Sequence, residues 1–333
     1  MVRQGQGLGE FKTVFFDEID DPYQVTMLLQ LSLFFPATPE LLWEIRANDD
    51  RYTPEFGIFA VTSNGTVAGG HLLMRIRTDT IEGGLEVGGV NAVATRPDFA
   101  RRGVMTAVMN KTHEYFIERD LEYSFLATSA RHVAAMMYEK LGYKELDRSR
   151  VAVKYPEHPR TQPASDISVR SFSEVDVPII DRIFRTAVAG SYGFIRRPNN
   201  FLRARNYTQN NEIRPTEKLR IAQRDGQPTG YAYWEGGARI TEAYEILAFD
   251  RPSFQALLVD AETRTPNSII WVWCGGLTNL ELGWLKDAGY QVPIESYKRA
   301  VIKKLRGEVD PRGVKMLYGV DQGKFRLGIW DET

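Results

Sequence analysis

The chain has 333 residues, of which 43% are hydrophobic and 26% charged, and its formal net charge is −1. This length predicts two domains, and the balanced charge gives no indication of binding to nucleic acid or to an anionic membrane. The single cysteine, Cys274, excludes a disulfide within the chain, and without an apolar run long enough for a signal peptide or a membrane span we expect a cytoplasmic protein.

The first half begins with alternating, strand-like runs around a tight turn. In FAVTSNGTVAGGHLLMRI, the pair Asn64-Gly65 separates two such runs, which predicts a β-hairpin. A further alternating run ends at Pro97, and a helical pattern with Val104 and Val108 on one side follows. The strand-like YSFLATSA and the helical RHVAAMMYEKLGY come next. This order predicts a mixed α/β fold with a strand–helix–strand unit, whose ligands bind at the carboxyl ends of the strands.

Two arginines, Arg101 and Arg102, stand directly before the first of these helices, in the sequence ARRGVM. A helix N-terminus carries partial positive charge and four unpaired N–H groups, so arginines are unfavourable there unless something negative lies at that end. Asp98 supplies some negative charge, and a bound phosphate would supply more. The pattern predicts a phosphate-binding loop, and the alternative is a solvated helix start.

A proline-rich stretch at residues 156–166 predicts a linker between an N-terminal domain, residues 1–155, and a C-terminal domain, residues 167–333. The last part of the second domain, around Gly323, is expected to form a short hairpin.

The second half echoes the first in the order of its signals. The pair Asp225-Gly226 predicts a second hairpin, and a helix ending at Gly289 and a tyrosine repeats the end of the helix at Gly142. A final alternating strand follows in both halves. Chance likeness of two α/β units is the alternative, but the ordered agreement favours a duplication.

The run VGGVNAVATRPDFARRGVMTAVM, followed some thirty residues later by MMYEKLGY, resembles the GCN5-related N-acetyltransferases (GNAT superfamily). The likeness covers residues 57–154, and the second half resembles a weaker copy. The usual pyrophosphate loop of the family is Arg/Gln-x-x-Gly-x-Gly/Ala, whereas this chain has Ala100 and Met105 at the first and last positions. The long aliphatic residue is similar to the Eis-like acetyltransferases, which carry two GNAT-type domains and normally a third, for which the short tail here has no room.

The resemblance implies acetyl-CoA as the co-substrate. Backbone N–H groups of the loop would hold the pyrophosphate, the glycine would let the backbone come close, and the arginine side chains would add positive charge. The loop residues implied are Arg101, Arg102, Gly103, Val104, Met105 and Thr106. The four histidines are scattered along the chain, so no metal site is expected.

The resemblance also implies contacts to the pantetheine arm. The strand Val93-Ala94-Thr95 would bond the arm through its backbone, and the N–H of Val93 would polarise the thioester carbonyl. Ser129 and Arg131 stand where the family often has an asparagine that bonds the arm, and Arg131 would contact a CoA phosphate instead. An ordinary buried strand is the alternative for residues 93–95.

Tyr138 matches the general acid of the family, five residues before the Gly-Tyr end of its helix, and the alternative is a core tyrosine. A general base is needed because an ammonium has no lone pair with which to attack. Glu86 and Glu82 precede the cofactor strand, although both are equally compatible with solvent-facing charges. A third candidate, similar to that of the Eis-like enzymes, is the terminal carboxylate of Thr333.

The second half lacks these features. Pro252 stands near the place where the loop glycine would be needed, and Leu285 matches Tyr138. We therefore expect a degenerate second domain that completes the substrate pocket. Tryptophans such as Trp234, Trp271 and Trp273 would line a shared cleft, or would simply pack in strands.

The resemblance and the loop together predict an acetyl-CoA-dependent N-acetyltransferase that acts on a primary amine of a small molecule by direct attack in a ternary complex. The alternatives are a protein amine as acceptor, and a non-catalytic module that binds or senses acyl-CoA. Neither nucleic acid nor a membrane is expected as a partner. A homo-oligomer and the use of other acyl-CoAs stay open.

Overall fold

The structure is a computed structural model that describes residues 11–131, 133–158, 161, 166–199, 201–202, 218–236 and 239–331. The strands of the first half are β1 (Phe11–Phe15), β2 (Tyr52–Thr62), β3 (Val67–Thr80), β4 (Gly83–Thr95), β5 (Tyr123–Ser129) and β6 (Lys144–Lys154). Its helices are α1 (Tyr23–Leu33), α2 (Pro39–Asn48), α3 (Val104–Glu118) and α4 (Val133–Lys140), with short 3₁₀ turns η1 (Phe16–Glu18) and η2 (Pro97–Phe99).

The second half follows a similar order, with α9 and β14 added at its end. Its strands are β7 (Ile167–Ser171), β8 (Tyr192–Gly193), β9 (Leu219–Arg224), β10 (Gln227–Gly236), β11 (Ile240–Ala248), β12 (Ile269–Trp273), β13 (Gln291–Lys304) and β14 (Phe325–Arg326). Its helices are α5 (Val177–Ala187), α7 (Arg251–Arg264), α8 (Asn279–Asp287) and α9 (Pro311–Leu317), with the 3₁₀ turns η3 (Glu174–Asp176) and η4 (Ile329–Asp331).

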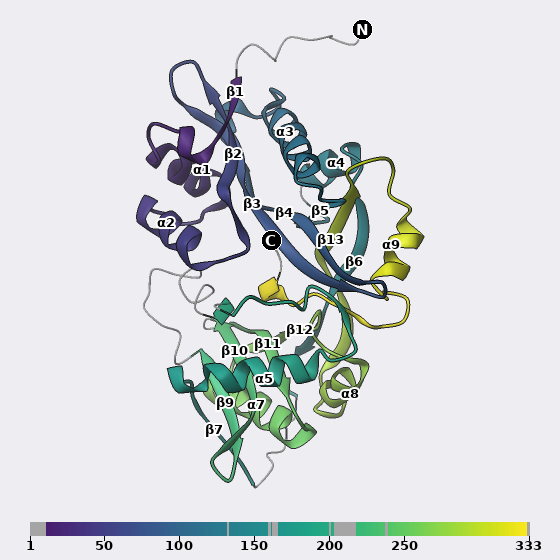
Figure 1. Cartoon of the computed structure of the whole chain (residues 1–333). Coiled ribbons are helices and arrows are strands. Elements are labelled where there is room, and N and C mark those ends of the chain that lie inside the picture. Colours follow the sequence, from purple (N-terminus) through teal and green to yellow (C-terminus); the bar gives the residue numbers. More distant parts are fainter. Residues whose placement is uncertain are drawn as a thin grey trace.

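All these strands belong to one mixed sheet, in the order β1-β2-β3-β4-β5-β13-β6-β12-β11-β10-β9-β7, with β8 and β14 attached beside β3 (Figure 1). The prediction of a mixed α/β fold is therefore confirmed. β13, from the second half, lies between β5 and β6 of the first half and pairs antiparallel with both. β6 in turn pairs with β12 of the second half. The two halves share hydrogen-bonded strands, and the division at residues 156–166 stays a prediction.

Two layers cover the sheet in the first half. Leu73 and Val90 pack with Val108 of α3, whereas their neighbours Met74 and Val87 pack on the other face. This is the alternation expected of a strand buried on both sides. α3 and α4 lie on one side of these strands and α1 and α2 on the other, as Figure 1 shows. The C-terminal segment, including α9, covers the rest of the second face.

The turn residues behave as their types require. Both predicted hairpins form: β2 pairs antiparallel with β3 across Asn64-Gly65, and β9 with β10 across Asp225-Gly226. Gly65 and Gly226 both have positive φ, which glycine adopts without strain. At the first turn, the backbone N–H of Thr66 donates to Thr62 Oγ1.

The C-terminal segment differs from the expected hairpin. Residues 311–317 form α9, because Asp310 caps the helix start by accepting from the N–H of Arg312 and Pro311 occupies the first helical position. β14 then pairs in parallel with β8, so its partner is distant in sequence. Within the described residues, no helix is long and apolar enough to cross a membrane.

Candidate active site

The central feature of the first half is a gap between two parallel strands. β4 and β5 pair only at Gly88–Ser124 and Gly89–Phe125. Beyond that point β5 continues alongside β13, while β4 continues alongside β3. The last residues of β4 therefore have an open edge on the side that β5 has left.

A bulge lies within this open part of β4. Gly70 pairs with Ala94 and Leu72 with Asn91, so Ala92 and Val93 have no partner residue in the β3 ladder. Ala92 has φ +54°, an uncommon conformation for a residue other than glycine. Bulges redirect backbone groups and are frequent beside functional sites. Val93 thus lies in the bulged part of β4, outside the paired register with β3.

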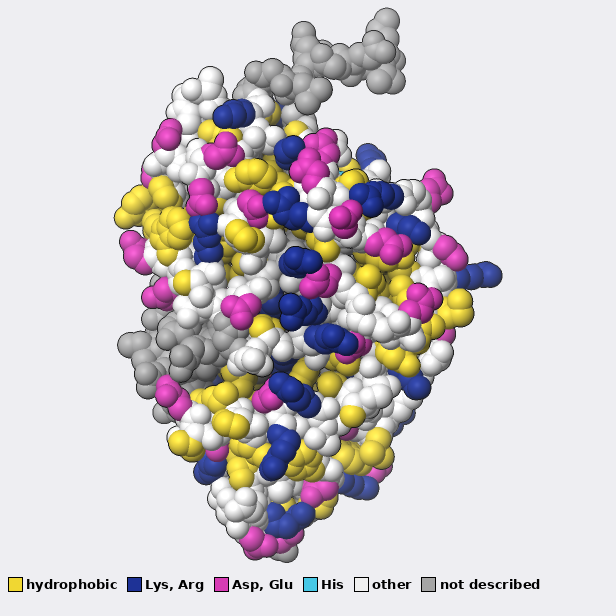
Figure 2. Space-filling model, viewed as in Figure 1, with side chains coloured by type: hydrophobic (Ala, Val, Ile, Leu, Met, Phe, Trp, Pro, Cys, Tyr) yellow, Lys and Arg dark blue, Asp and Glu magenta, His cyan; other side chains and the backbone are white. Residues whose placement is uncertain are grey.

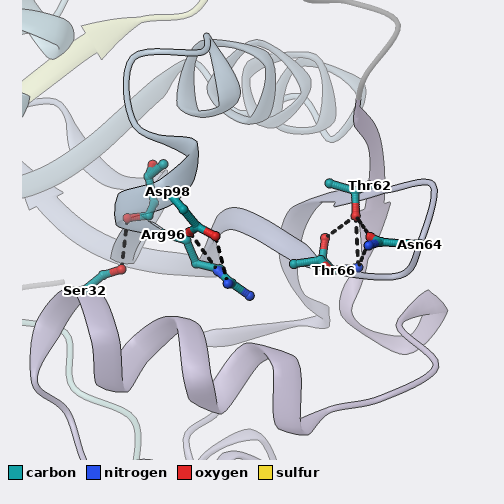
Figure 3. Close-up of polar contacts among 7 residues, drawn as sticks. Ser32, Thr62, Asn64, Thr66, Arg96 and Asp98 are labelled. Carbon is teal, nitrogen blue, oxygen red and sulfur yellow. Dashed lines mark hydrogen bonds and ion pairs between the residues drawn. The ribbon is translucent and has the colours of Figure 1, made fainter.

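The end of β4 presents polar groups to the same open edge. The N–H of Arg96 donates to Ala68 O at 2.9 Å, toward β3. Because alternate residues of a strand point their N–H and C=O groups to opposite sides, those of Thr95 point away from β3. The Thr95 carbonyl accepts a hydrogen bond of 3.0 Å from Ser32 Oγ of α1. Figure 3 draws this bond as the dashed line that starts at Ser32. Nothing in the sequence of α1 indicated this contact.

The loop from β4 to α3 ends in two residues with left-handed backbone, Arg101 (φ +63°) and Gly103 (φ +80°). Gly103 is the N-cap of α3, no side chain caps the helix, and its first turn holds no acidic residue. The first backbone bond of the helix runs from Ala107 N to Gly103 O. The N–H groups of residues 104–106 consequently have no acceptor within the helix. Four features favourable to an anion coincide here: partial positive charge, free N–H groups, exposed arginines and no carboxylate.

Asp98 does not cap this helix. Its carboxylate accepts two hydrogen bonds from Arg96, of 3.1 and 2.9 Å (Figure 3). That contact holds the pKa of Asp98 below its usual range, with a smaller contribution from Arg102. The Arg102 guanidinium lies 5.1 Å from the ring of Phe99. The Asp98 carboxylate therefore pairs with Arg96 and does not cap the start of α3.

Tyr138 lies in the core beneath the start of α3. Its side chain is 4% exposed and shares a hydrophobic cluster with Val104 and Met105, against which Val93 also packs. Its ring is in edge contact with Tyr143, with 5.8 Å between centroids. Burial raises the pKa of Tyr138 well above its usual range. The structure thus brings Tyr138, Val93 and the loop to one region.

Ser129 and Arg131 lie at the carboxyl end of β5. The N–H of Arg131 donates to Ser129 Oγ at 3.2 Å, and the Arg131 side chain is exposed. Ser129 pairs with Lys298 of β13, and the N–H of the next residue donates to Tyr297 O at 2.7 Å. Residues of the second half therefore set the position of this strand end.

Glu86 lies apart from these groups. It is seven residues before Val93 on the same strand, a separation of roughly 20 Å at the rise of an extended chain. Its carboxylate pairs with Arg75 and Arg77.

Figure 2 shows basic side chains in a band down the middle of the visible face, crossing the region of β3 and β4. Glu82 is exposed in the β3–β4 turn. Thr333, the third candidate base, lies outside the described residues.

The matching region of the second half is built differently. Only two residues separate β11 from α7, compared with the eight-residue loop before α3. The carboxylate of Asp250 caps α7 by accepting from the N–H of Ser253 at 2.8 Å. Leu285, which matches Tyr138, is fully buried. The chain's own carboxylate thus occupies the position that an anion would take.

The three tryptophans do not line one cleft. Trp234 belongs to the hydrophobic core of the second half, in a different cluster from Trp273. Trp271 and Trp273 are neighbours, with 5.9 Å between ring centroids, and Lys298 Nζ lies 5.3 Å from the Trp273 ring. A cavity of about 440 Å³ beside Trp234 opens between β10 and the end of α7, away from the first-half site. In the described part of the chain, no three His, Cys, Asp or Glu side chains are grouped to hold a metal ion.

Comparisons with known proteins agree with this geometry. Residues 20–146 match the family described as the acetyltransferase (GNAT) domain. No curated protein sequence matches the chain. Several solved structures share its fold, among them the three described next. A GCN5-related N-acetyltransferase from Anabaena variabilis is 15% identical, with a TM-score of 0.66 over 89% of this chain and 73% of that one.

A second GCN5-related N-acetyltransferase, from Kribbella flavida, is 12% identical, with a TM-score of 0.64 over 90% of this chain and 72% of that one. The Eis1 protein of Mycobacterium abscessus is 13% identical, with a TM-score of 0.58 over 88% and 74% of the two chains. At these identities the likeness shows a common fold, and it extends over both halves. Residues 20–146 of the chain are therefore a GNAT acetyltransferase domain.

Proposed function

We propose that the chain is an acetyl-CoA-dependent N-acetyltransferase with one active site, in its first half, and that it acts on a primary amine of a small molecule. The observation that carries this proposal is the uncapped, acid-free N-terminus of α3 at Gly103, directly beside the open edge of β4. A ligand with a pyrophosphate and an amide-containing arm fits both features at once.

The residues present fit acetyl-CoA. The pyrophosphate would accept from the N–H groups of residues 104–106, with Arg101 and Arg102 adding positive charge. The absence of a Cβ at Gly103 keeps that approach open. The arm would pair with the free edge at residues 93–95, as an added strand pairs with a sheet edge. Ser129 and Arg131 would contact the arm or the adenosine phosphates.

The chemistry assigned to this chain uses two groups. Bound acetyl-CoA supplies an activated acetyl group and a thiolate leaving group. The N–H of Val93 would donate to the carbonyl oxygen as negative charge develops there during attack by the neutral amine. Tyr138 would protonate the departing sulfur, and its raised pKa keeps the phenol protonated until then. Glu86, Glu82 and the terminal carboxylate stay the predicted bases, of which Glu86 would need water to reach the amine.

Two observations favour a second function. Neither glutamate lies near Val93, and Ala100 and Met105 depart from the family loop. A module that binds acyl-CoA without transferring the acetyl group would need neither base nor acid. A protein amine is a further alternative acceptor.

The test combines binding with turnover. Titration of the chain with acetyl-CoA by calorimetry should give one site, because α7 is capped by Asp250 and α3 is free. Thiol release from acetyl-CoA is then measured with a panel of polyamines, aminoglycosides, amino-acid derivatives and lysine-containing peptides. Amine-dependent release supports the transferase, and binding without release by any amine or peptide supports the sensor. Absence of binding overturns the proposal.

A further inference from the structure

The last turn of α1 is fixed to the end of β4 by one side chain. Ser32 Oγ donates to Thr95 O at 3.0 Å, across 63 residues of sequence. In Figure 3 the Ser32 side chain projects from its helix toward the ribbon that carries Arg96. The residues on either side of it, Leu31 and Leu33, are exposed, so Ser32 directs a polar group inward between two solvent-facing positions.

This bond acts on a particular peptide plane. The peptide that joins Thr95 to Arg96 donates through its N–H to Ala68 O on one side. Its carbonyl accepts from Ser32 on the other side. Both the N–H and the carbonyl of this peptide therefore have hydrogen-bond partners, although β5 does not pair with this part of β4. A carbonyl oxygen carries two lone pairs, so one remains for a donor at the open edge of β4.

We propose that Ser32 is a positioning residue for the pantetheine arm of acyl-CoA, acting by orienting the Thr95 carbonyl toward an amide N–H of that arm. This inference rests on the proposed function. The arm contains two amides separated by a flexible chain, and its pairing with a strand edge requires that the edge keep its hydrogen-bonding groups in register. Without the hydroxyl, the last peptide of β4 would be held from one side only.

The test compares two ligands on four proteins: wild type, Ser32→Ala, Ser32→Thr and Thr186→Ala. Thr186 is a matched control, because its hydroxyl also donates to a backbone carbonyl, Arg182 O, within α5. The ligands are acetyl-CoA and adenosine 3′,5′-bisphosphate, which keeps the adenosine, the 3′-phosphate and one of the two 5′-phosphates but lacks the arm. Dissociation constants are measured by calorimetry.

Loss of one oriented hydrogen bond should weaken acetyl-CoA binding to Ser32→Ala by about fivefold. Binding of adenosine 3′,5′-bisphosphate should be unchanged, and Ser32→Thr, which keeps the hydroxyl, should bind acetyl-CoA like wild type. An equal loss for both ligands would show a general structural effect and overturn the inference, as would unchanged binding of acetyl-CoA to Ser32→Ala. Wild type that binds neither ligand would overturn the proposed function itself.

Discussion

Arg197 and Asp331 form a bidentate ion pair, with Nε–Oδ1 at 2.8 Å and Nη2–Oδ2 at 2.7 Å. Both side chains are less than one-tenth exposed. The same guanidinium donates through Nη1 to Glu245 at 3.0 Å, so one arginine serves two buried carboxylates. Just before Asp331, the N–H of Leu327 donates to Gly275 O. The end of the described chain is thus fixed on the second half.

Replacement of Arg197 should destabilise the fold strongly. Arg197→Met keeps the apolar stem but leaves two buried carboxylates without a cation, which typically costs about 3–5 kcal/mol in the free energy of unfolding. Urea denaturation at pH 7 measures this quantity. The control is Arg251→Met, which removes an exposed pair with Asp287 and should cost under about 1 kcal/mol. Equal effects of the two variants would contradict the prediction.

Tyr138→Phe should separate catalysis from binding. Loss of a general acid typically lowers turnover by about 10²–10⁴-fold, while acetyl-CoA affinity should stay unchanged. Because burial raises the pKa of Tyr138, deprotonation of this phenol should cause no loss of wild-type activity between pH 7 and about 10.

The control for that variant is Tyr143→Phe. The Tyr143 hydroxyl is 2.6 Å from Ser124 Oγ and also contacts His113. Its removal should therefore lower thermal stability, whereas the large loss of turnover expected for Tyr138→Phe should not occur. Turnover by Tyr138→Phe at the wild-type rate would exclude Tyr138 as the acid.

A charge placed at residue 103 should interfere with cofactor binding. Aspartate and asparagine both tolerate left-handed backbone, and a Cβ at Gly103 meets no atom within 4 Å. Gly103→Asp adds a carboxylate where the pyrophosphate is proposed to bind, whereas Gly103→Asn adds the same shape without charge. At an effective dielectric typical of surfaces, repulsion at 4 Å is about 4 kcal/mol per charge pair, so affinity should fall at least tenfold more for Asp than for Asn.

Thermal unfolding supplies the check on that pair of variants. Aspartate is a favourable N-cap, so Gly103→Asp should be at least as stable as Gly103→Asn. Equal acetyl-CoA affinity of the two variants would contradict the proposal that the pyrophosphate binds at this loop.

The fold should lose stability in mild acid. His71 is fully buried, with Nδ1 3.0 Å from Leu72 O and Nε2 2.6 Å from Thr112 Oγ1, and burial lowers its pKa to about 4. His113 has a pKa of about 4 as well, chiefly through burial. Between about pH 6.5 and 4 the unfolded chain binds more protons than the folded one, so the free energy of unfolding should fall as pH falls.

Urea denaturation at pH 7, 6 and 5 measures this slope. His71→Gln should be less stable at pH 7 but show a shallower pH dependence, because one of the two groups no longer titrates. A steeper slope in the variant, or stability that rises toward pH 5, would contradict the assignment.

Local features were predictable from the sequence because they depend on a few adjacent residues. Asn64-Gly65 and Asp225-Gly226 form turns through their own backbone preferences, and Gly142 and Gly289 end helices with positive φ. The loop at Gly103 was recognisable for the same reason. The spacing of the residues in this loop and the start of the helix after it both depend on residues adjacent in the sequence.

Contacts between distant segments were not predictable in this way. Ser32 looks like any serine near the end of a helix, and only the fold brings it to Thr95. Glu86 looked suitable as a base because it precedes the cofactor strand, but strand geometry places it among Arg75 and Arg77. The position of β13 between β5 and β6 has no signal in a single sequence, since strand pairing is chosen by the whole sheet.

That position of β13 has a consequence for synthesis of the protein. A ribosome delivers β5 and β6 long before β13, which begins about 160 residues after β5 ends, a long separation for a contact that must form during folding. Until residue 304 has emerged, two strand edges of the nascent first half lack their native neighbour and are open to unwanted pairing. Synthesis of the second half is thus a requirement for completing the first.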